Sequence, residues 1–274
     1  KSFETLGITG GRVGVDLITF DILSVLKSLL PKAEFVTGED CLNEAKKLKT
    51  GEEIKCAAMA AACVDIGMEA ARGAVEIGKR EGEILGEGMK EMYRLGMQMP
   101  QGMPFVASGE ENLCPLVRFA TDRIVRAGEL VVASFGGYFN GMWAEAKRTF
   151  CCGRPNSRQK EIYGAVWEAN EAALKAIRPG ASSQEVMEAV TRTLQQRGLA
   201  DFQLKQPLAH GIGVGGWEPP FIEHGAPSFR LEPGMVLTLE PAVAVPEVPG
   251  GGTVAIGNML VVTDAGNAVI TRSS

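Results

Sequence analysis

AARGAVEIGKREGEILGEGMKEMYRLGM, residues 70–97, is the first of two similar stretches in the chain. It aligns without gaps onto AALKAIRPGASSQEVMEAVTRTLQQRGL, residues 172–199. The identical pairs are Ala70 and Ala172, Ala71 and Ala173, Ala74 and Ala176, Gly78 and Gly180, Glu83 and Glu185, and Gly96 and Gly198. Each copy reads as a helix, a glycine-containing break and a second helix ending at glycine. The repeat therefore predicts an α+β domain of two similar helix–helix–strand halves that face one another.

Hydrophobic patterns predict further elements around this repeat. Helices are expected over residues 52–77, 81–95, 157–177 and 183–197, and strands over 105–108, 129–135 and within 140–150. Upstream, residues 10–16 read as a turn entering a strand, followed by a helix through Leu30 and a strand at 33–36. We interpret residues 1–45 as the C-terminal remnant of an upstream α/β domain, and residues 46–274 as the main domain.

Composition excludes several classes of protein. Hydrophobic residues make up 45% and charged residues 22%, which is typical of a globular protein. The net charge of −5 argues against a nucleic-acid partner, because phosphate binding needs clustered Lys and Arg. No apolar run reaches the length that spans a bilayer, so no membrane partner is expected. Six cysteines without CxxC spacing predict reduced thiols and a cytoplasmic location.

Three ionisable residues are candidates for chemistry in the crevice between the halves. His210 lies in the glycine-rich segment AHGIGVGG, Glu240 ends the apolar run MVLTLE, and Glu145 follows Trp143 in a predicted strand. Taken singly, His210 also fits a hydrogen-bonded core histidine, and each glutamate fits a charge at the end of a strand or on the surface. Neither a phosphate-binding loop nor a Gly-x-Ser-x-Gly hydrolase is indicated. Cysteine–histidine catalysis stays open.

Several ordered motifs resemble the superfamily of creatinase, prolidase, aminopeptidase P and methionine aminopeptidase. The motifs are KTGEEI at 49–54, VASG at 106–109, AHGIG at 209–213, EPP at 218–220, LEPGMVLTLEP at 231–241 and LVVTDAG at 260–266. This resemblance covers nearly the whole chain. It implies a duplicated pita-bread fold, a curved antiparallel sheet flanked by helices, and makes the upstream fragment part of a creatinase-type N-terminal domain.

The resemblance also implies five metal ligands, two Asp, one His and two Glu, which hold two divalent ions. His210 and Glu240 match intact, and Glu145 falls on the second Asp. Ser134 falls on the first Asp and Gly257 on the last Glu, so two expected carboxylates are missing. We therefore expect no complete dinuclear centre, and either no cofactor or one weakly bound ion of manganese, cobalt or zinc at Glu145, His210 and Glu240.

Two further histidines of the superfamily fall on Val117 and Trp217, and Val117 stands where creatinase has its catalytic histidine. Creatinase acts on a C–N bond without metal, but its mechanism does not transfer directly to a chain with valine there. Without metal, two facing glutamates should raise the pKa of one carboxyl, which could then act as an acid, or they could receive a cationic substrate group. Trp217 fits either an aromatic wall or packing in an emptied metal cavity.

Three functions remain open from the sequence. The first is a hydrolase or lyase acting on a small amino-acid-like or short-peptide substrate through Glu145, His210 and Glu240. The second is an inactive domain kept as a binding partner, and the third is a divergent Xaa-Pro metallopeptidase with substituted ligands. The residues expected to bind substrate are Trp143, Trp217, Glu218 and His224. The resemblance also implies a homodimer or an assembly with a paralogue.

Overall fold

The computed structural model describes residues 5–7, 10–98, 104–112 and 119–273. The chain divides into two compact units, residues 1–46 and 47–274. In the first unit, β1 (Gly11–Val15) pairs in parallel with β2 (Ala33–Thr37), and α2 (Phe20–Leu29) connects them. Both predicted strands and the helix between them are confirmed. A further helix, α3 (Glu39–Lys47), follows. That this unit is a domain remnant stays a prediction.

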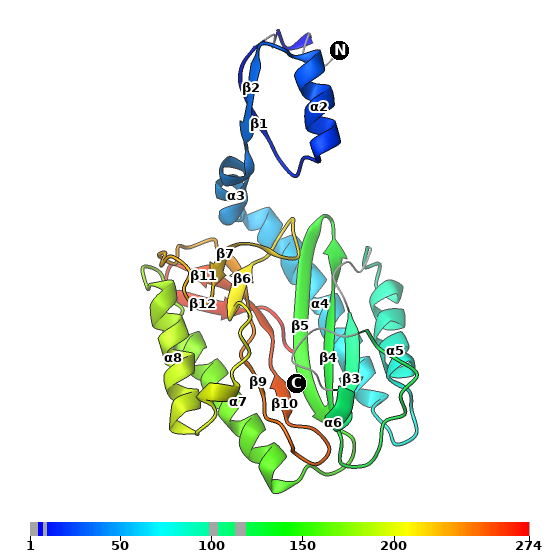
Figure 1. Ribbon diagram of the computed structural model, residues 1–274. Helices are drawn as coiled ribbons and strands as arrows, with labels where there is room; N and C mark the ends of the chain where they lie inside the picture. The colour runs from blue at the N-terminus through cyan, green and yellow to red at the C-terminus, as the bar shows by residue number, and fades with distance from the viewer. Residues whose placement is uncertain (1–4, 8–9, 99–103, 113–118, 274) are drawn as a thin grey trace. The chain divides into compact units, whose positions relative to one another are not determined.

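The first half of the second unit places a helical pair against a three-stranded antiparallel sheet (Figure 1). Its elements are α4 (Gly51–Gly73), α5 (Glu81–Arg94), β3 (Phe105–Ser108), α6 (Gly109–Asn112), β4 (Leu130–Phe139) and β5 (Met142–Cys151). A capping box starts α4, because the Thr50 side chain and the Glu53 carboxylate bond each other's backbone N–H. The sheet order is β3-β4-β5.

The second half repeats this plan with a larger sheet. Its elements are α7 (Ser157–Ala176), α8 (Ser183–Gln196), the 3₁₀ turn η1 (Ala200–Phe202), β6 (Ala209–Gly211), β7 (Glu218–Ile222), β8 (Val236–Leu239), β9 (Ala242–Ala244), β10 (Thr253–Ala255), β11 (Asn258–Thr263) and β12 (Gly266–Val269). The five-stranded sheet has the order β12-β11-β8-β6-β7, and β9 pairs with β10. Its β-strand pairs are antiparallel.

The repeat seen in the sequence is confirmed as two equivalent helical pairs. Gly78 and Gly180 occupy the breaks between helices with φ of +91° and +79°, a region that favours glycine. The N–H of Gly78 donates to the carbonyl of Val125 at 3.0 Å, and the N–H of Gly180 donates to that of Leu231 at 2.8 Å. These matched bonds tie each helical pair to a connecting segment, which precedes β4 in the first half and β8 in the second.

The matched glutamates of the repeat also have the same task. Glu83 and Glu185 each close a capping box at the start of the second helix of their pair. In both boxes the carboxylate accepts a hydrogen bond from the N-cap backbone, which satisfies a donor that the helix itself leaves free. The conserved spacing of the two copies therefore has a local physical cause, and both helices begin where the sequence predicts.

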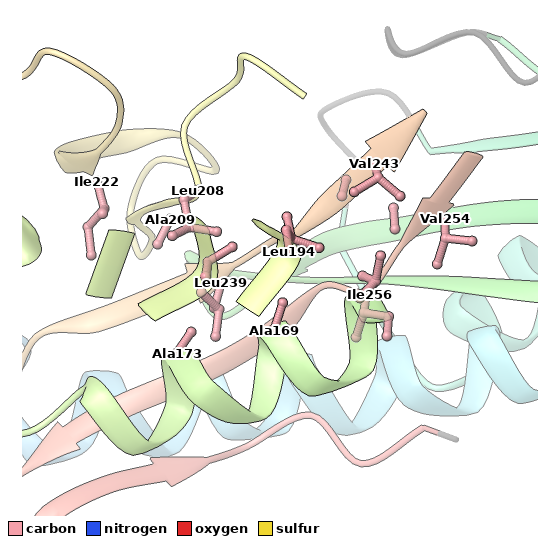
Figure 2. Packing of buried hydrophobic residues seen from close by; sticks show 14 of the residues in the cluster. Ala169, Ala173, Leu194, Leu208, Ala209, Ile222, Leu239, Val243, Val254 and Ile256 are labelled. Atoms are coloured by element: carbon pink, nitrogen blue, oxygen red, sulfur yellow. The ribbon is translucent and has the colours of Figure 1, made fainter. Parts of the chain in front are cut away.

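Two hydrophobic cores lie under the two helical pairs, and β4 contributes to both. Leu130 and Val132 pack in the core beneath α7 and α8, while Val131, Ala133 and Phe135 pack in the core beneath α4 and α5. Figure 2 shows the first of these cores from close by, with the alanines of α7 facing the strands. The strand predicted at residues 129–135 is confirmed as β4, and both of its faces are buried.

A backbone bridge between Lys147 on β5 and Gly257 just before β11 joins the two halves. The N–H of Gly257 donates to the carbonyl of Lys147 at 2.8 Å, and the reverse bond measures 3.3 Å. The candidate residues of both halves are brought together at this meeting point. None of the helices in the described part of the chain is long and apolar enough to cross a membrane.

Candidate functional site

Glu145, His210 and Glu240 converge, although they come from distant parts of the chain. Each offers one ligand-type atom, and these three atoms lie within 4.8 Å of one another. The Nε2 of His210 is 3.2 Å from the Oε1 of Glu145. His210 is fully buried and Glu240 is 2% exposed, so the cluster lies out of bulk water. Electrostatic interactions at such depth are much stronger than at the surface.

Antiparallel pairing positions the three side chains. Glu145 lies on β5 opposite Gly136 of β4. His210 lies on β6 opposite Thr238 of β8. Glu240 follows β8 directly, and its N–H donates to the carbonyl of Leu208 at 2.7 Å. Because each element belongs to a paired sheet, the three carboxylate and imidazole groups are held by rigid backbone rather than by loops.

Lys147 is a fourth member of the cluster that the sequence interpretation missed. Its Nζ donates to the Oε2 of Glu240 at 2.5 Å, and its side chain is only 11% exposed. Lys147 lies two residues after Glu145 on β5, so both side chains point to the same face of the strand. That alternation was visible in the sequence, but the contact with Glu240, 93 residues away, was not.

Several polar atoms of the cluster lack a hydrogen-bond partner among the described residues. They are Glu145 Oε1, His210 Nε2, Glu240 Oε1 and the neighbouring Thr238 Oγ1. The 3.2 Å between His210 and Glu145 suits an ion pair, but the two atoms are not aligned for a hydrogen bond. Buried polar atoms are normally satisfied. A group of unsatisfied ones at one place is typical of a site that receives a ligand.

Charge in the cluster determines its protonation. Burial alone would lower the pKa of His210, but the contact with Glu145 outweighs it and raises that pKa above its usual value. Burial would raise the pKa of Glu145, yet His210 and Lys147 hold it below its usual value. Burial would also lower the pKa of Lys147, which Glu240 and Glu145 instead raise. The sequence-based expectation of an elevated carboxyl pKa is therefore wrong for Glu145, because cations surround it.

Aromatic rings border the cluster. The indole of Trp217 stacks on the His210 ring with centroids 4.5 Å apart and planes 15° apart. The Nε1 of Trp143 donates to the Oε2 of Glu145 at 3.2 Å. Trp143 is buried, whereas Trp217 is 55% exposed. Trp217 therefore covers His210 from the solvent side, and the choice between its two expected roles stays a prediction.

The other predicted substrate-binding residues lie differently. The carboxylate of Glu218 is occupied on both oxygens, by Lys49 Nζ at 2.6 Å and by the N–H of Gly215 at 3.0 Å. His224 is exposed and lines a separate cavity of about 360 Å³ beside α8, whose lining includes none of the three clustered residues. A substrate contact for either residue stays a prediction. Val117 lies outside the described residues.

The two positions expected to have lost a carboxylate both neighbour Lys147. Ser134 lies directly opposite Lys147 in the pairing of β4 with β5. Gly257 forms the backbone bridge to Lys147 on its other side. A Cβ added at Gly257 would lie 2.8 Å from the backbone nitrogen of Lys147 and 2.9 Å from its Cβ. Without a backbone shift, the chain therefore has no room for a side chain at Gly257.

Comparison with known proteins agrees with the fold. The model of metallopeptidase family M24 matches residues 55–264. An Xaa-Pro dipeptidase of Pyrococcus furiosus is 29% identical over 273 residues, covering 100% of this chain and 75% of the relative. An uncharacterized peptidase of Bacillus subtilis, YqhT, is 30% identical over 271 residues, covering 98% of this chain and 75% of the relative.

Solved structures give the same result. The prolidase from Pyrococcus furiosus has a TM-score of 0.89 and 28% identity, covering 100% of this chain and 80% of its own. The Xaa-Pro dipeptidase from Bacillus anthracis has a TM-score of 0.90 and 29% identity, covering 100% of this chain and 75% of its own. The predicted duplicated α+β pita-bread fold and the predicted superfamily are thereby confirmed. This chain belongs to metallopeptidase family M24.

Proposed function

We propose that the protein is a hydrolase that cleaves the C–N bond of a dipeptide or a similarly small amino-acid-like substrate, without a complete pair of metal ions. The observation that carries this proposal is the convergence of Glu145, His210 and Glu240, each with an unpartnered polar atom among the described residues. The printed names of the relatives, Xaa-Pro dipeptidase and prolidase, support a peptide-like substrate.

Two divalent ions do not fit the donors present at this place. A pair of hard cations needs several anionic oxygen ligands, and the cluster offers two carboxylates and one imidazole. One of those carboxylate oxygens already binds the Lys147 ammonium. A single ion would contact Glu145, His210 and Glu240, where it would act as a Lewis acid. That ion would have to share Glu240 with Lys147.

The chain's own residues can supply acid and base. Glu240 keeps one oxygen, Oε1, free of protein partners in the described chain, and this oxygen can accept a proton from an attacking water. His210 donates through Nδ1 to the carbonyl of Gly211 at 2.9 Å, which leaves Nε2 to hold the exchangeable proton. Protonated His210 can give that proton to the leaving amine as the C–N bond breaks. Transfer of the water's proton from Glu240 to His210 restores the site.

A binding role without turnover is the second candidate. The salt bridge between Lys147 and Glu240 favours it, because one oxygen of that carboxylate is already occupied by the ammonium. In this case the cluster would recognise a small amino-acid-like ligand, or the domain would assemble with an active paralogue. A homodimer and a cytoplasmic location remain predictions, and light scattering of the purified protein tests the first.

A substrate screen separates these functions. Xaa-Pro and Xaa-Ala dipeptides and simple amides should be incubated with wild-type protein in chelator and in manganese, followed by amine detection. Glu240→Gln should lower turnover about a hundredfold or more, as expected for losing a general base. Glu223→Gln, which changes an exposed glutamate, is the matched control and should keep full activity.

Each outcome points to one function. Turnover in chelator that Glu240→Gln abolishes supports the proposal, and full activity of that variant contradicts it. Calorimetric binding of an uncleaved dipeptide by a protein that cleaves nothing supports the second candidate. Turnover that requires two bound ions per chain identifies a divergent Xaa-Pro metallopeptidase instead.

A further inference from the structure

We propose that the ammonium of Lys147 is a built-in cation that takes the place of a metal ion between Glu145 and Glu240. The inference concerns the same side chains as the proposed function, but it concerns what occupies the site and not whether substrate is turned over. It predicts that wild-type protein excludes divalent ions from this cluster, in a fold whose family is named for metal-dependent peptidases.

The first observation is the contact itself. The Nζ of Lys147 lies 2.5 Å from the Oε2 of Glu240, and the two side chains are 11% and 2% exposed. A charge-assisted hydrogen bond of this length in a buried place is strong. A divalent ion that used the same oxygen would stand within contact distance of the ammonium. Since like charges repel steeply at low dielectric, ion and ammonium exclude one another.

The second observation is the identity of the neighbours. Ser134 faces Lys147 across β4, and Gly257 bonds it on the opposite side. These are the two positions at which the five-ligand pattern expects carboxylates and this chain has none. Four carboxylates suit two divalent ions, whereas a single ammonium cannot balance so much negative charge. With two carboxylates and one ammonium, the buried cluster is therefore nearer to electrical balance than four carboxylates without a metal ion would be.

The third observation is that one position excludes the missing ligand sterically. A Cβ at Gly257 would come within 2.9 Å of the Lys147 Cβ, so a glutamate there and the present Lys147 backbone do not fit together. The close approach of the two backbones therefore keeps a carboxylate ligand out of this position, next to the residue that carries the ammonium. The remaining N–H groups of Lys147, with no further partner among the described residues, can donate to the carbonyl oxygen of a bound substrate.

The test measures Mn²⁺ binding by titration calorimetry and by electron paramagnetic resonance of the free ion. The variants are Lys147→Met, which keeps the length and removes the charge, and Lys147→Met combined with Glu240→Gln. Lys90→Met, which removes a surface lysine paired with Glu87, is the control. We expect wild type and Lys90→Met to bind Mn²⁺ at least about 100-fold more weakly than Lys147→Met, which should hold one ion per chain. The double variant should lose the ion again.

Wild-type protein that binds Mn²⁺ as tightly as Lys147→Met would overturn the proposal, and so would a folded Lys147→Met that binds none. If Lys147→Met does not fold, the melting temperature of the wild-type protein tests the proposal instead. Its melting temperature should be the same in EDTA and in millimolar MnCl₂, and a rise of several degrees would show that the ion enters. Neither readout depends on turnover, so a protein with no peptidase activity can still support this inference, and an active one can contradict it.

Discussion

Two buried lysine–glutamate pairs lie in the same domain and differ in completeness. In the pair Lys49–Glu218, both side chains are 3% exposed and both carboxylate oxygens have partners. In the pair Lys147–Glu240, one carboxylate oxygen has no partner within the described chain, and a second carboxylate and an imidazole stand beside it. In the first pair, the contacts to both carboxylate oxygens help to offset the cost of desolvating the two charges, as expected for a structural ion pair. The second is arranged to receive something else.

The largest expected effect comes from breaking the complete pair. Lys49→Met leaves the Glu218 carboxylate buried without its cation and should destabilise the protein by about 3–5 kcal/mol. Urea denaturation measures this loss. Replacing both partners, with Lys49→Met and Glu218→Gln together, should recover most of it. A single variant as stable as wild type would mean that the pair does not differ from a surface ion pair.

Breaking the incomplete pair should cost less and should respond to metal. We expect the free energy of unfolding of Lys147→Met to fall by about 1–3 kcal/mol in EDTA, because one Glu240 oxygen is left without a hydrogen-bond donor. Mn²⁺ at a hundred times its dissociation constant should return about 2.7 kcal/mol. Lys49→Met should gain nothing from Mn²⁺. Equal responses of the two variants would remove the distinction between the pairs.

The stability contributed by the cluster around the incomplete pair should also depend on pH, because His210 and Glu145 titrate there. His210 has a raised pKa, so its contribution is complete below its unfolded value of 6.5 and is lost as pH rises through the folded pKa. Glu145 has a lowered pKa, so its contribution is complete above its unfolded value of 4.5 and is lost as pH falls through the folded pKa. The stability difference between wild type and Glu145→Gln should therefore be greatest between pH 4.5 and 6.5.

Denaturation curves at intervals from acid to mildly alkaline pH measure this window. The control is Glu223→Gln, whose exposed carboxylate should give a difference that stays small across the range. A difference for Glu145→Gln that stays constant with pH would show that the carboxylate and the imidazole do not interact.

The smallest expected effect is at the edge of the cluster. Trp217→Ala removes a half-exposed ring stacked on His210 and should cost about 0.5–1.5 kcal/mol. The loss should be measured by urea denaturation at pH 5.5. The variant Trp167→Ala, which changes another half-exposed tryptophan outside the cluster, is the control. A loss above about 3 kcal/mol would place Trp217 among core residues rather than at a rim.

Local features of this fold could be predicted well from the sequence. Gly78 and Gly180 were matched by the repeat because each must adopt a positive φ at the same point of a helical hairpin. Glu83 and Glu185 were matched because each closes a capping box within three residues of its partner. Such constraints act over a few residues, so they leave a signal that spacing alone reveals.

Long-range contacts left no comparable signal. The carboxylate of Glu218 pairs with Lys49, 169 residues away in the chain, and no local pattern predicted this contact. Lys147 was overlooked because its partner is Glu240, which follows a strand of the other half. The three residues that were predicted to converge were found through a family resemblance, since antiparallel pairing of distant strands is what brings them together. Ion pairs inside a core are set by the tertiary structure, so the spacing of residues along the chain does not reveal them.

The double burial of β4 has a consequence for motion. Alternate side chains of β4 pack in two different cores. If the strand moved with one half alone, its side chains would lose their packing in the core of the other half. The two halves of residues 47–274 are therefore coupled through β4, which opposes their hinged closure around a ligand. The half-exposed Trp217 ring over His210 lies at the rim of the cluster, where a small displacement would change access to the imidazole.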